Sequence, residues 1–366
     1  MYFYEDGGHT ISTIRMLSYK FHLLLKYMHK MCKTILLILF FSFALNAQEV
    51  NYSVKLGWKP TDKVIILHVD DVGMSYEANH GAIEAMEHGV ASSCSVMMPC
   101  PWVPEYMHYL KEHPKTDAGL HLTLTSEWRD YRWGPVAGVK IVPGLTDQEG
   151  ALYYDVPAVA MRATPDEVDT EIHAQLDRAR KMGWEPTHLD SHMGTLFSSP
   201  AYLAKYIQLG IEQHIPIMLP GGHNTLMKKT NPVNDEWLLS LKKTQQDFLK
   251  ETGKRLWDSG LPVIDDLHNM SYEWVPTPAM KSKADLRKFK TQKYIESFKD
   301  LQPGVTFVIM HCSIASDIFP HISDSGPLRQ ADLEAMMDPA FKKYLDKAGI
   351  IVTTWREMME RRKMIK

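Results

Sequence analysis

Residues 64–73 of the chain read VIILHVDDVG, an apolar run that contains His68 and leads to two adjacent aspartates, a valine and a glycine. Continuous apolar runs are typical of strands that are buried on both faces of a parallel sheet. Seven further short runs follow, most of them of the same kind. We therefore expect strands at 64–69, 93–98, 119–124, 186–189, 215–219, 262–264, 305–310 and 350–353.

Helical patterns separate these strands. The clearest covers 165–182, where Thr164 is an N-cap, Pro165 opens the first turn, Glu167 completes a capping box and Gly183 ends the helix. Further helices are expected at 75–89, 200–213, 234–252, 283–299 and 330–347. Seven or eight strand-then-helix units predict an α/β protein with an irregular TIM-like (β/α) barrel, built as a single domain over residues 48–366.

The N-terminal segment has the features of an export signal. Lys30 and Lys33 precede the apolar stretch TILLILFFSFALNA at 34–47, the pattern of a secretory signal peptide. The apolar run is shorter than the ~20 residues that span a bilayer. We expect cleavage near Ala47, export to the periplasm or the exterior without stable membrane insertion, and an over-extended start over residues 1–27.

Composition limits the partners. With 45% hydrophobic and 23% charged residues, the 366-residue chain is neither disordered nor collagen-like. Its formal charge is −3 and no basic block stands out, which argues against nucleic acid as a partner.

Cys32 leaves with the signal, and Cys94, Cys100 and Cys312 are expected to be buried thiols. The oligomeric state is left open, a homodimer included.

Aspartate and histidine recur at the ends of the expected strands. Asp70 and Asp71 end the first strand, His121 lies in the third, His192 follows the fourth and His311 ends the seventh. In (β/α) barrels the catalytic groups lie at the carboxyl ends of the strands. Two imidazoles and a carboxylate are a common ligand set for a divalent metal with open positions. A second aspartate could then deprotonate water, and a further histidine could protonate a leaving group.

The motifs DDVGMS at 70–75, GLH at 119–121 and PTHLDSH at 186–192 resemble the successive motifs of the YdjC-like (ChbG/HpnK) carbohydrate deacetylases. This family is distantly similar to the NodB-like polysaccharide deacetylases. A strand that ends in His311 and a later Trp355 resemble its C-terminal pattern, so the resemblance covers roughly residues 62–358. The family's first motif usually begins with Asn-Ala, where this chain has His68 and Val69.

The resemblance implies a role for each matching residue. Asp71, His121 and His192 match the metal ligands, Asp70 matches the general base and His311 matches the proposed general acid. The implied cofactor is one divalent metal ion, magnesium or zinc before nickel or cobalt. The implied reaction removes N-acetyl groups from an amino-sugar-containing oligosaccharide or polysaccharide.

The long irregular stretch 126–163 is a candidate substrate-binding loop. Its aromatic and arginine side chains, Trp128, Arg129 and Trp133 among them, could stack on sugar rings and bond hydroxyl groups. The alternative is a loop that packs on its own aromatic residues.

Other polar residues of the motifs have two interpretations each. His68 could line the pocket. Asp190 could contact substrate, orient a ligand histidine or cap a turn. Arg329 could reach substrate or pair with an acidic neighbour. For His188 a core histidine is favoured over a ligand, and the aspartates 265–266 are interpreted as caps or substrate contacts, not as a second metal site.

Two rival functions stay open. A metallohydrolase that removes O-acetyl or other acyl groups would use the same residues. A non-catalytic glycan-binding protein could keep the fold, although retention of every motif histidine and aspartate argues against it. An iron oxygenase would share the ligand types, but it would not explain Asp70 or His311.

Overall fold

The computed structural model describes residues 51–230 and 244–365, and Asn51–Lys366 forms one compact unit. The expected signal segment at 1–47 and the first part of the helix expected at 234–252 lie outside the described residues. Within the described part, no helix is long and apolar enough to cross a membrane.

The described residues form one parallel sheet of seven strands. The hydrogen-bonded order is β4-β3-β2-β1-β6-β5, and β7 pairs with the start of β1. This confirms the α/β class. The strands are β1 (Lys63–Val72), β2 (Ser93–Val96), β3 (Ala118–Leu122), β4 (Leu189–Ser191), β5 (Asp266–His268), β6 (Gly304–Met310) and β7 (Ile350–Val352).

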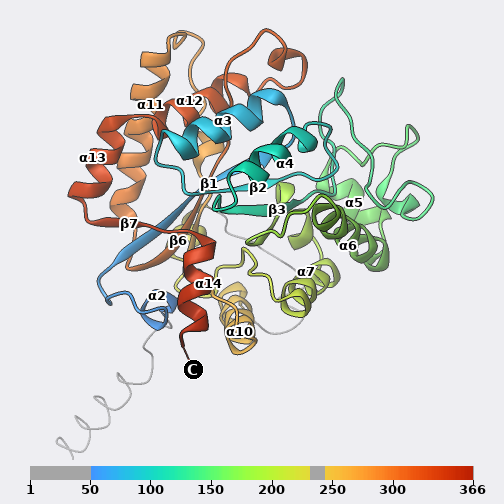
Figure 1. Cartoon of the computed structure of the whole chain (residues 1–366), viewed down its shortest axis with the longest axis horizontal. Helices are drawn as coiled ribbons and strands as arrows, with labels where there is room; N and C mark the ends of the chain where they lie inside the picture. Colours follow the sequence, from blue (N-terminus) through green and yellow to red (C-terminus); the bar gives the residue numbers. More distant parts are fainter. Residues whose placement is uncertain (1–50, 231–243, 366) are drawn as a thin grey trace, which may run out of the picture. The chain divides into compact units, whose positions relative to one another are not determined.

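Helices surround this sheet. In Figure 1, α3, α11, α12 and α13 lie above the strands in the view, whereas α7 and α10 lie below them. The helices are α2 (Tyr52–Lys55), α3 (Tyr76–Glu87), α4 (Val103–Glu112), α5 (Val156–Arg162), α6 (Pro165–Lys181), α7 (Pro200–Gln213), α8 (Thr225–Thr230), α10 (Gln245–Asp258), α11 (Lys283–Ser297), α12 (Gly326–Met336), α13 (Pro339–Lys347) and α14 (Trp355–Lys363). Short 3-10 turns are η1 (Pro143–Leu145), η2 (His192–Phe197), η3 (Ser271–Glu273), η4 (Phe298–Asp300) and η5 (Phe319–His321).

The sheet differs from a barrel of eight regular strands. The strand predicted at 215–219 is absent as a ladder, and the segment makes single bridges instead, from Ile217 to β4 and from Pro220 to Ile264. Pro216 and Pro220 lack the backbone N–H that a ladder needs, which explains the interruption. The described strands are therefore an open parallel path whose two ends approach through isolated bridges.

Three predicted elements need a shift or a division. The strand predicted at 186–189 begins later, as β4, and the one predicted at 262–264 gives way to β5. The helix predicted at 330–347 is two helices, α12 and α13, because Asp338 caps a new helix that starts at Pro339. The capping box predicted for α6 is present, with Thr164 and Glu167 bonding each other's backbone.

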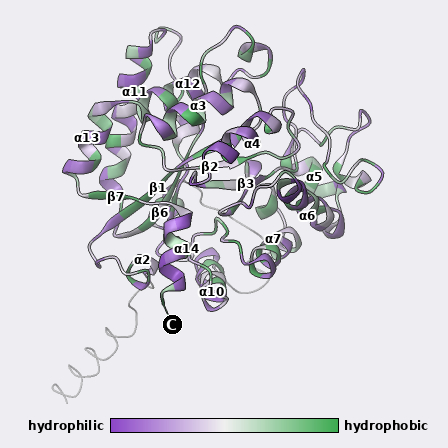
Figure 2. Cartoon of the chain, viewed as in Figure 1, coloured by the Kyte–Doolittle hydropathy of each residue, from purple (hydrophilic) through white to green (hydrophobic). Residues whose placement is uncertain are grey.

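The core lies along the central strands. Residues 64–67 of β1 and all residues of β2 are completely buried, and every residue of β3 is buried as well. Figure 2 shows hydrophobic residues concentrated on β1 and β6, while α6 and α14 are mostly hydrophilic. Burial on both faces leaves the carboxyl ends of the strands as the polar edge of the sheet, and the motif residues lie there.

Candidate active site

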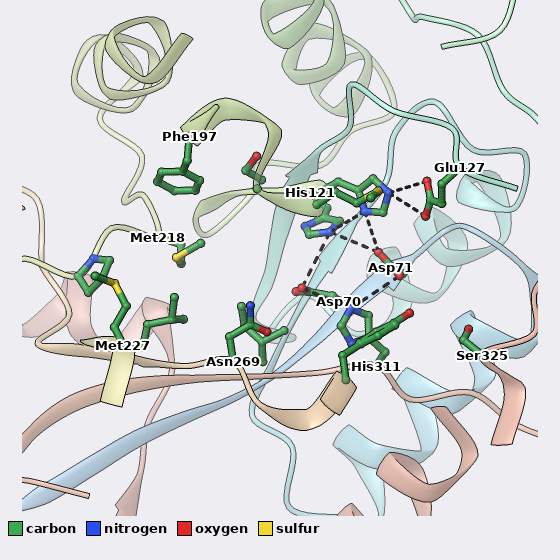
Figure 3. A pocket seen from close by; sticks show the side chains of 18 of the residues that line it. Asp70, Asp71, His121, Glu127, Phe197, Met218, Met227, Asn269, His311 and Ser325 are labelled. Atoms are coloured by element: carbon green, nitrogen blue, oxygen red, sulfur yellow. Dashed lines mark hydrogen bonds and ion pairs between the residues drawn. The ribbon is translucent and has the colours of Figure 1, made fainter. Parts of the chain in front are cut away.

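Both adjacent aspartates reach one cavity because β1 is irregular where they stand. Between two register pairs β1 advances by three residues while β2 advances by two, which is a β-bulge. Asp71 also has a φ of 65°, a left-handed conformation that non-glycine residues rarely adopt. The bulge interrupts the usual alternation of side chains, so Asp70 and Asp71 both line the cavity in Figure 3.

Three ligand-type atoms converge at this point. Asp71 Oδ1 lies 3.3 Å from His121 Nε2 and 3.2 Å from His192 Nδ1, and the two nitrogens are 3.3 Å apart. All three residues are buried, and Asp71 Oδ1 accepts no hydrogen bond from the described part of the chain. The structure therefore brings together the three residues that the sequence predicts as ligands.

The outer ring nitrogens fix which atoms face inward. His121 Nδ1 donates to Asp190 Oδ1 at 2.6 Å, and His192 Nε2 donates to the Glu127 carboxylate at 3.0 Å. In a neutral imidazole the other nitrogen then carries a lone pair, so two lone pairs and a carboxylate oxygen face one point. Ligands about 2.05 Å from a tetrahedral zinc ion would be separated by about 3.3 Å, which agrees with these distances. The residues thus could hold a divalent cation.

The electrostatics of the cluster favour a positive charge between Asp71, His121 and His192. Burial alone would raise the pKa of Asp71, but Arg329 and the two histidines hold it well below its usual range. Burial would lower the pKa of His192, but Glu127 and Asp71 raise it to about 9. For His121 the carboxylates outweigh burial in the same way, and its pKa is well above the usual value. Protons or a cation can supply this charge.

His68 does not line the cavity, so the interpretation that it could line the pocket is wrong. It is completely buried, and its Nε2 lies 3.0 Å from Asp70 Oδ1 and 3.0 Å from Asp190 Oδ2. Burial would lower its pKa, but hydrogen bonds to the two carboxylates raise that pKa to about 9. His68 therefore holds Asp70 from behind and leaves Asp70 Oδ2 toward the cavity.

His311 lies just after β6 on the cavity wall. Its Nε2 is 3.8 Å from Asp70 Oδ2 and 3.9 Å from Asp71 Oδ2, and the Tyr272 ring packs edge-on against it at 4.4 Å. Burial lowers the pKa of His311 to about 4, against the opposing effect of Asp71. The imidazole is therefore neutral near pH 7 and can accept a proton before it donates one.

Arg329 lines the cavity and forms an ion pair with Asp71. Pairing with an acidic neighbour is one of the two interpretations that the sequence left open. Its Nη2 donates to Asp71 Oδ2 and to the Tyr272 hydroxyl, both at 2.7 Å, and its Nε donates to Ser325 Oγ. Asp190 is buried and does not line the cavity, so it is not placed to contact a substrate there. Its carboxylate orients His121 instead, the alternative that the sequence left open.

Three residues of the loop at 126–163 were predicted to contact substrate, and one of the three lines the cavity. Trp128 lines the cavity, and the Arg329 guanidinium lies 5.8 Å from the centre of its ring. Trp133 is buried and donates to the Thr125 carbonyl, and Arg129 is exposed and pairs with Asp130. Neither Trp133 nor Arg129 lines the cavity, so their predicted substrate contacts are not part of this site. Trp133 packs against Trp128, as expected for a loop built on its own aromatic residues.

The remaining motif residues are structural. His188 is completely buried and stacks on Trp355 at 5.2 Å, which confirms the core interpretation. Asp265 accepts backbone N–H bonds from Tyr52, Ser53 and Val305, and Asp266 accepts two from the start of α8, so both are caps. The three described cysteines are free and buried, as predicted.

The cavity has a volume of about 670 Å³ and includes residues that the motifs do not indicate. Glu127 is the most important of them for the cluster. A carboxylate six residues after His121 is its only sequence signal, and loop carboxylates are too common for that to identify it. The other cavity residues outside the motifs include Asn269, Tyr272, Phe197, Met218 and Met227.

The architecture is that of an enzyme. Acidic and imidazole groups converge in a cavity at the carboxyl edge of the strands of a parallel α/β fold. The model of the YdjC-like protein family matches residues 64–347, and the chain belongs to this family. Its similarity to curated deacetylases makes it a hydrolase of the carbohydrate deacetylase class.

Several relatives give the extent of that similarity. A carbohydrate deacetylase of Thermus thermophilus is 26% identical over 298 residues, which cover 81% of this chain and 94% of the relative. One from Brevibacillus brevis is 33% identical over 165 residues, 45% of this chain and 62% of the relative. A chitooligosaccharide deacetylase of Yersinia enterocolitica is 32% identical over 135 residues, 36% of this chain and 49% of the relative.

The fold also has a solved counterpart. The crystal structure of a protein from Enterococcus faecalis V583, proposed to cleave cellobiose-phosphate, superposes with a TM-score of 0.61. The match covers 81% of this chain and 99% of that one at 19% sequence identity. At this identity the likeness supports the fold.

Proposed function

We propose that the chain removes N-acetyl groups from an amino-sugar-containing carbohydrate with the help of one divalent metal ion. The observation that carries the proposal is the set of inward-facing lone pairs on Asp71, His121 and His192. Their outer partners, Asp190 and Glu127, orient the two rings so that both inner nitrogens face one point, where a cation can replace protons. The names of the relatives support the substrate class, and the choice of magnesium, zinc, nickel or cobalt is a matter for measurement.

A divalent ion held by these ligands would polarise the acyl carbonyl and lower the pKa of a water molecule. Asp70 is positioned to accept a proton from the attacking water, because His68 holds one of its oxygens and the other faces the cavity. His311 Nε2, 3.8 Å from that second oxygen, can pass a proton to the departing amine. Water oxygen bonds to the acyl carbon, the C–N bond breaks, and acetate and a free amino sugar result.

The groups around His311 suit a sugar. Trp128 and Tyr272 provide ring surfaces for the apolar faces of a pyranose, and Ser325 and Asp324 provide hydroxyl partners. Arg329 is held rigidly by Asp71, Tyr272 and Ser325, so it contributes a fixed positive charge beside the reacting bond. These contacts support binding of the sugar at this end of the cavity.

The test is acetate release from N-acetylated and O-acetylated oligosaccharides by the purified protein, with and without chelator. Chelator-sensitive acetate from an amino sugar is the expected result. Release from O-acetyl substrates alone would make the protein an esterase on the same site. No acetate from any substrate, with metal bound in stoichiometric amount, would contradict the proposal and favour glycan binding without catalysis.

We also infer that the segment 215–220 completes an irregular barrel by joining β4 to the segment before β5. Its two isolated bridges support this closure. Closure would place residues of this segment, such as Met218 and Pro220, on the cavity wall opposite β1 and β2, and both do line the cavity.

Export after cleavage near Ala47 is likewise a proposal, and it rests on the sequence of residues 34–47 alone. Fractionation of the native host and N-terminal sequencing of the mature protein would test it. Intact residues 1–47 on protein from the cytoplasmic fraction would overturn it.

A further inference from the structure

One part of the cavity is not explained by hydrolysis of an acetyl group. Six side chains, Phe197, Leu203, Met218, Met227, Phe248 and Leu267, form a mostly carbon-lined region that we call the apolar arm. They come from η2, α7, the segment before α8, α8, α10 and β5. The arm is therefore built by the elements that run from η2 to β5 along the chain, at the end of the cavity away from His311.

The apolar arm and the polar groups lie at opposite ends of the cavity. In Figure 3, Phe197, Met218 and Met227 lie on one side of Asp70 and His121, whereas His311 and Ser325 lie on the other. The polar side also carries Asp324 and Arg329. An elongated ligand that crosses the reacting centre would thus have one polar end and one apolar end.

The chemistry of amide hydrolysis decides which end of the substrate lies where. The amide has a sugar amine on one side of its carbonyl carbon and an acyl chain on the other. His311, the proposed proton donor to the amine, stands at the polar end, so the sugar lies there. The acyl chain then points toward the apolar arm, and a single methyl group would leave most of that carbon surface against water.

A sugar ring is a poor occupant for the arm. Among the described lining residues around it, hydrogen-bonding side chains are few: Ser191, Gln245 and Asn269. A hydroxylated ring would bury several hydroxyl groups, and a buried hydroxyl without a hydrogen-bond partner opposes binding. An alkyl chain has no such requirement.

We propose that the site accepts amino sugars whose N-acyl group is longer than acetyl, with the alkyl chain in the apolar arm. This inference rests on the proposed amide hydrolysis and specifies its acyl group. The reaction balances as before: water oxygen joins the acyl carbon, the C–N bond breaks and a proton reaches the amine. The products are the free amino sugar and a short- or medium-chain carboxylate.

The first experiment measures amine release from a series of glucosamine oligosaccharides that carry N-acetyl, N-butyryl, N-hexanoyl or N-octanoyl groups. Burial of each added methylene should raise kcat/KM roughly fourfold until the arm is full. A maximum at N-acetyl, with a fall for each added carbon, would overturn the inference and leave deacetylation intact. Amine release from none of the substrates, N-acetyl included, would instead contradict the proposed hydrolysis itself.

Two variants probe the arm directly. Met218→Phe narrows it and should reduce the octanoyl-to-acetyl ratio of kcat/KM roughly 15-fold, the effect of about two methylenes. Phe197→Ala widens it and should move the preferred chain to a greater length. Met161→Phe is the matched control, because Met161 is 78% exposed on α5 and does not line the cavity.

Melting temperatures establish that each variant is folded. An unchanged chain-length profile in both folded arm variants would contradict the inference. A loss of activity confined to longer N-acetyl oligosaccharides would also contradict the inference, because it would mean that a sugar ring occupies the arm.

Discussion

Glu127 and Asp190 stand behind the two ligand-type histidines in the same way. Each carboxylate accepts a hydrogen bond from the outer nitrogen of one ring, Glu127 from His192 and Asp190 from His121. Without these two acceptors, the inner nitrogens 3.3 Å apart could bond each other through a proton instead of binding a cation. Carboxylates of this kind fix the tautomer and raise the basicity of metal-ligand histidines.

Glu127→Gln should therefore weaken metal binding about 10- to 100-fold, because the amide still accepts a hydrogen bond but lacks the negative charge. Competition with a chromophoric chelator measures the dissociation constant directly. Glu149→Gln, at an exposed position of the same loop, is the matched control. An affinity that is equal in the two variants would show that Glu127 does not support His192.

The adjacent aspartates should differ sharply when each is replaced by asparagine. Asp71→Asn should lose bound metal and activity together, because Asp71 supplies the carboxylate of the cluster. Asp70→Asn should retain metal and lose about 10²- to 10⁴-fold in kcat, the usual contribution of a general base. Metal content by mass spectrometry and kcat on one substrate separate the two roles, and loss of metal from Asp70→Asn would make Asp70 a ligand.

At the scale of elements, the convergence of the site could be predicted from strand ends alone. Asp71, His121 and His311 end or follow parallel strands, and such ends meet at one edge of a sheet. The β1 bulge and the left-handed Asp71 could not be predicted, because they depend on how β1 pairs with β2. For the same reason the direction of the His68 side chain, away from the cavity, is a property of the sheet and not of its own sequence.

The prediction of a strand at 215–219 failed because apolar composition indicates burial but does not determine backbone hydrogen bonding. The segment 215–219 is apolar enough to be buried, and it is buried, but burial does not guarantee a ladder. Prolines at 216 and 220 remove two donors, so the segment makes isolated bridges. An apolar run therefore predicted that this segment lies in the core, but not how it pairs with its neighbours.

Strand β5 carries a histidine whose environment makes the fold sensitive to acid. His268 is buried among Trp274, Tyr294 and Phe298, and burial lowers its pKa to about 4. The unfolded chain has a histidine pKa near 6.5, so the folded state binds fewer protons between pH 6.5 and 4. The stability associated with neutral His268 is complete above pH 6.5 and is lost as the pH falls toward 4.

His268→Phe should therefore flatten the pH dependence of stability. Between pH 7 and pH 5 the wild-type chain should lose about 2 kcal/mol more of its unfolding free energy than the variant. Urea unfolding at the two pH values, in the presence of chelator for both proteins, measures the difference. Parallel losses in the two proteins would mean that His268 does not titrate on unfolding.

At the scale of the whole molecule, the site gathers charge from distant parts of the chain. Residues of β1, β3 and β4 contribute to it, and Arg329 of α12 reaches Asp71 across 258 positions of sequence. Four carboxylates, of Asp70, Asp71, Glu127 and Asp190, meet there in a largely buried place. Their mutual repulsion opposes folding, so a cation that binds the assembled cluster should stabilise the entire unit.

Removal of the metal should consequently lower the melting temperature of the protein, because the ligand atoms are brought together only in the folded state. At a free metal concentration of 100 times the dissociation constant, binding adds about 2.7 kcal/mol, which corresponds to roughly 5 °C or more. Thermal unfolding followed against the logarithm of metal concentration should show a steady rise, with magnesium, zinc, nickel and cobalt compared in turn. Asp71→Asn should abolish the rise, whereas Glu149→Gln should preserve it. A melting temperature that is independent of metal in the wild-type chain would mean that the converging lone pairs of Asp71, His121 and His192 do not form a cation site, and the charge of the cluster would then be balanced by protons alone.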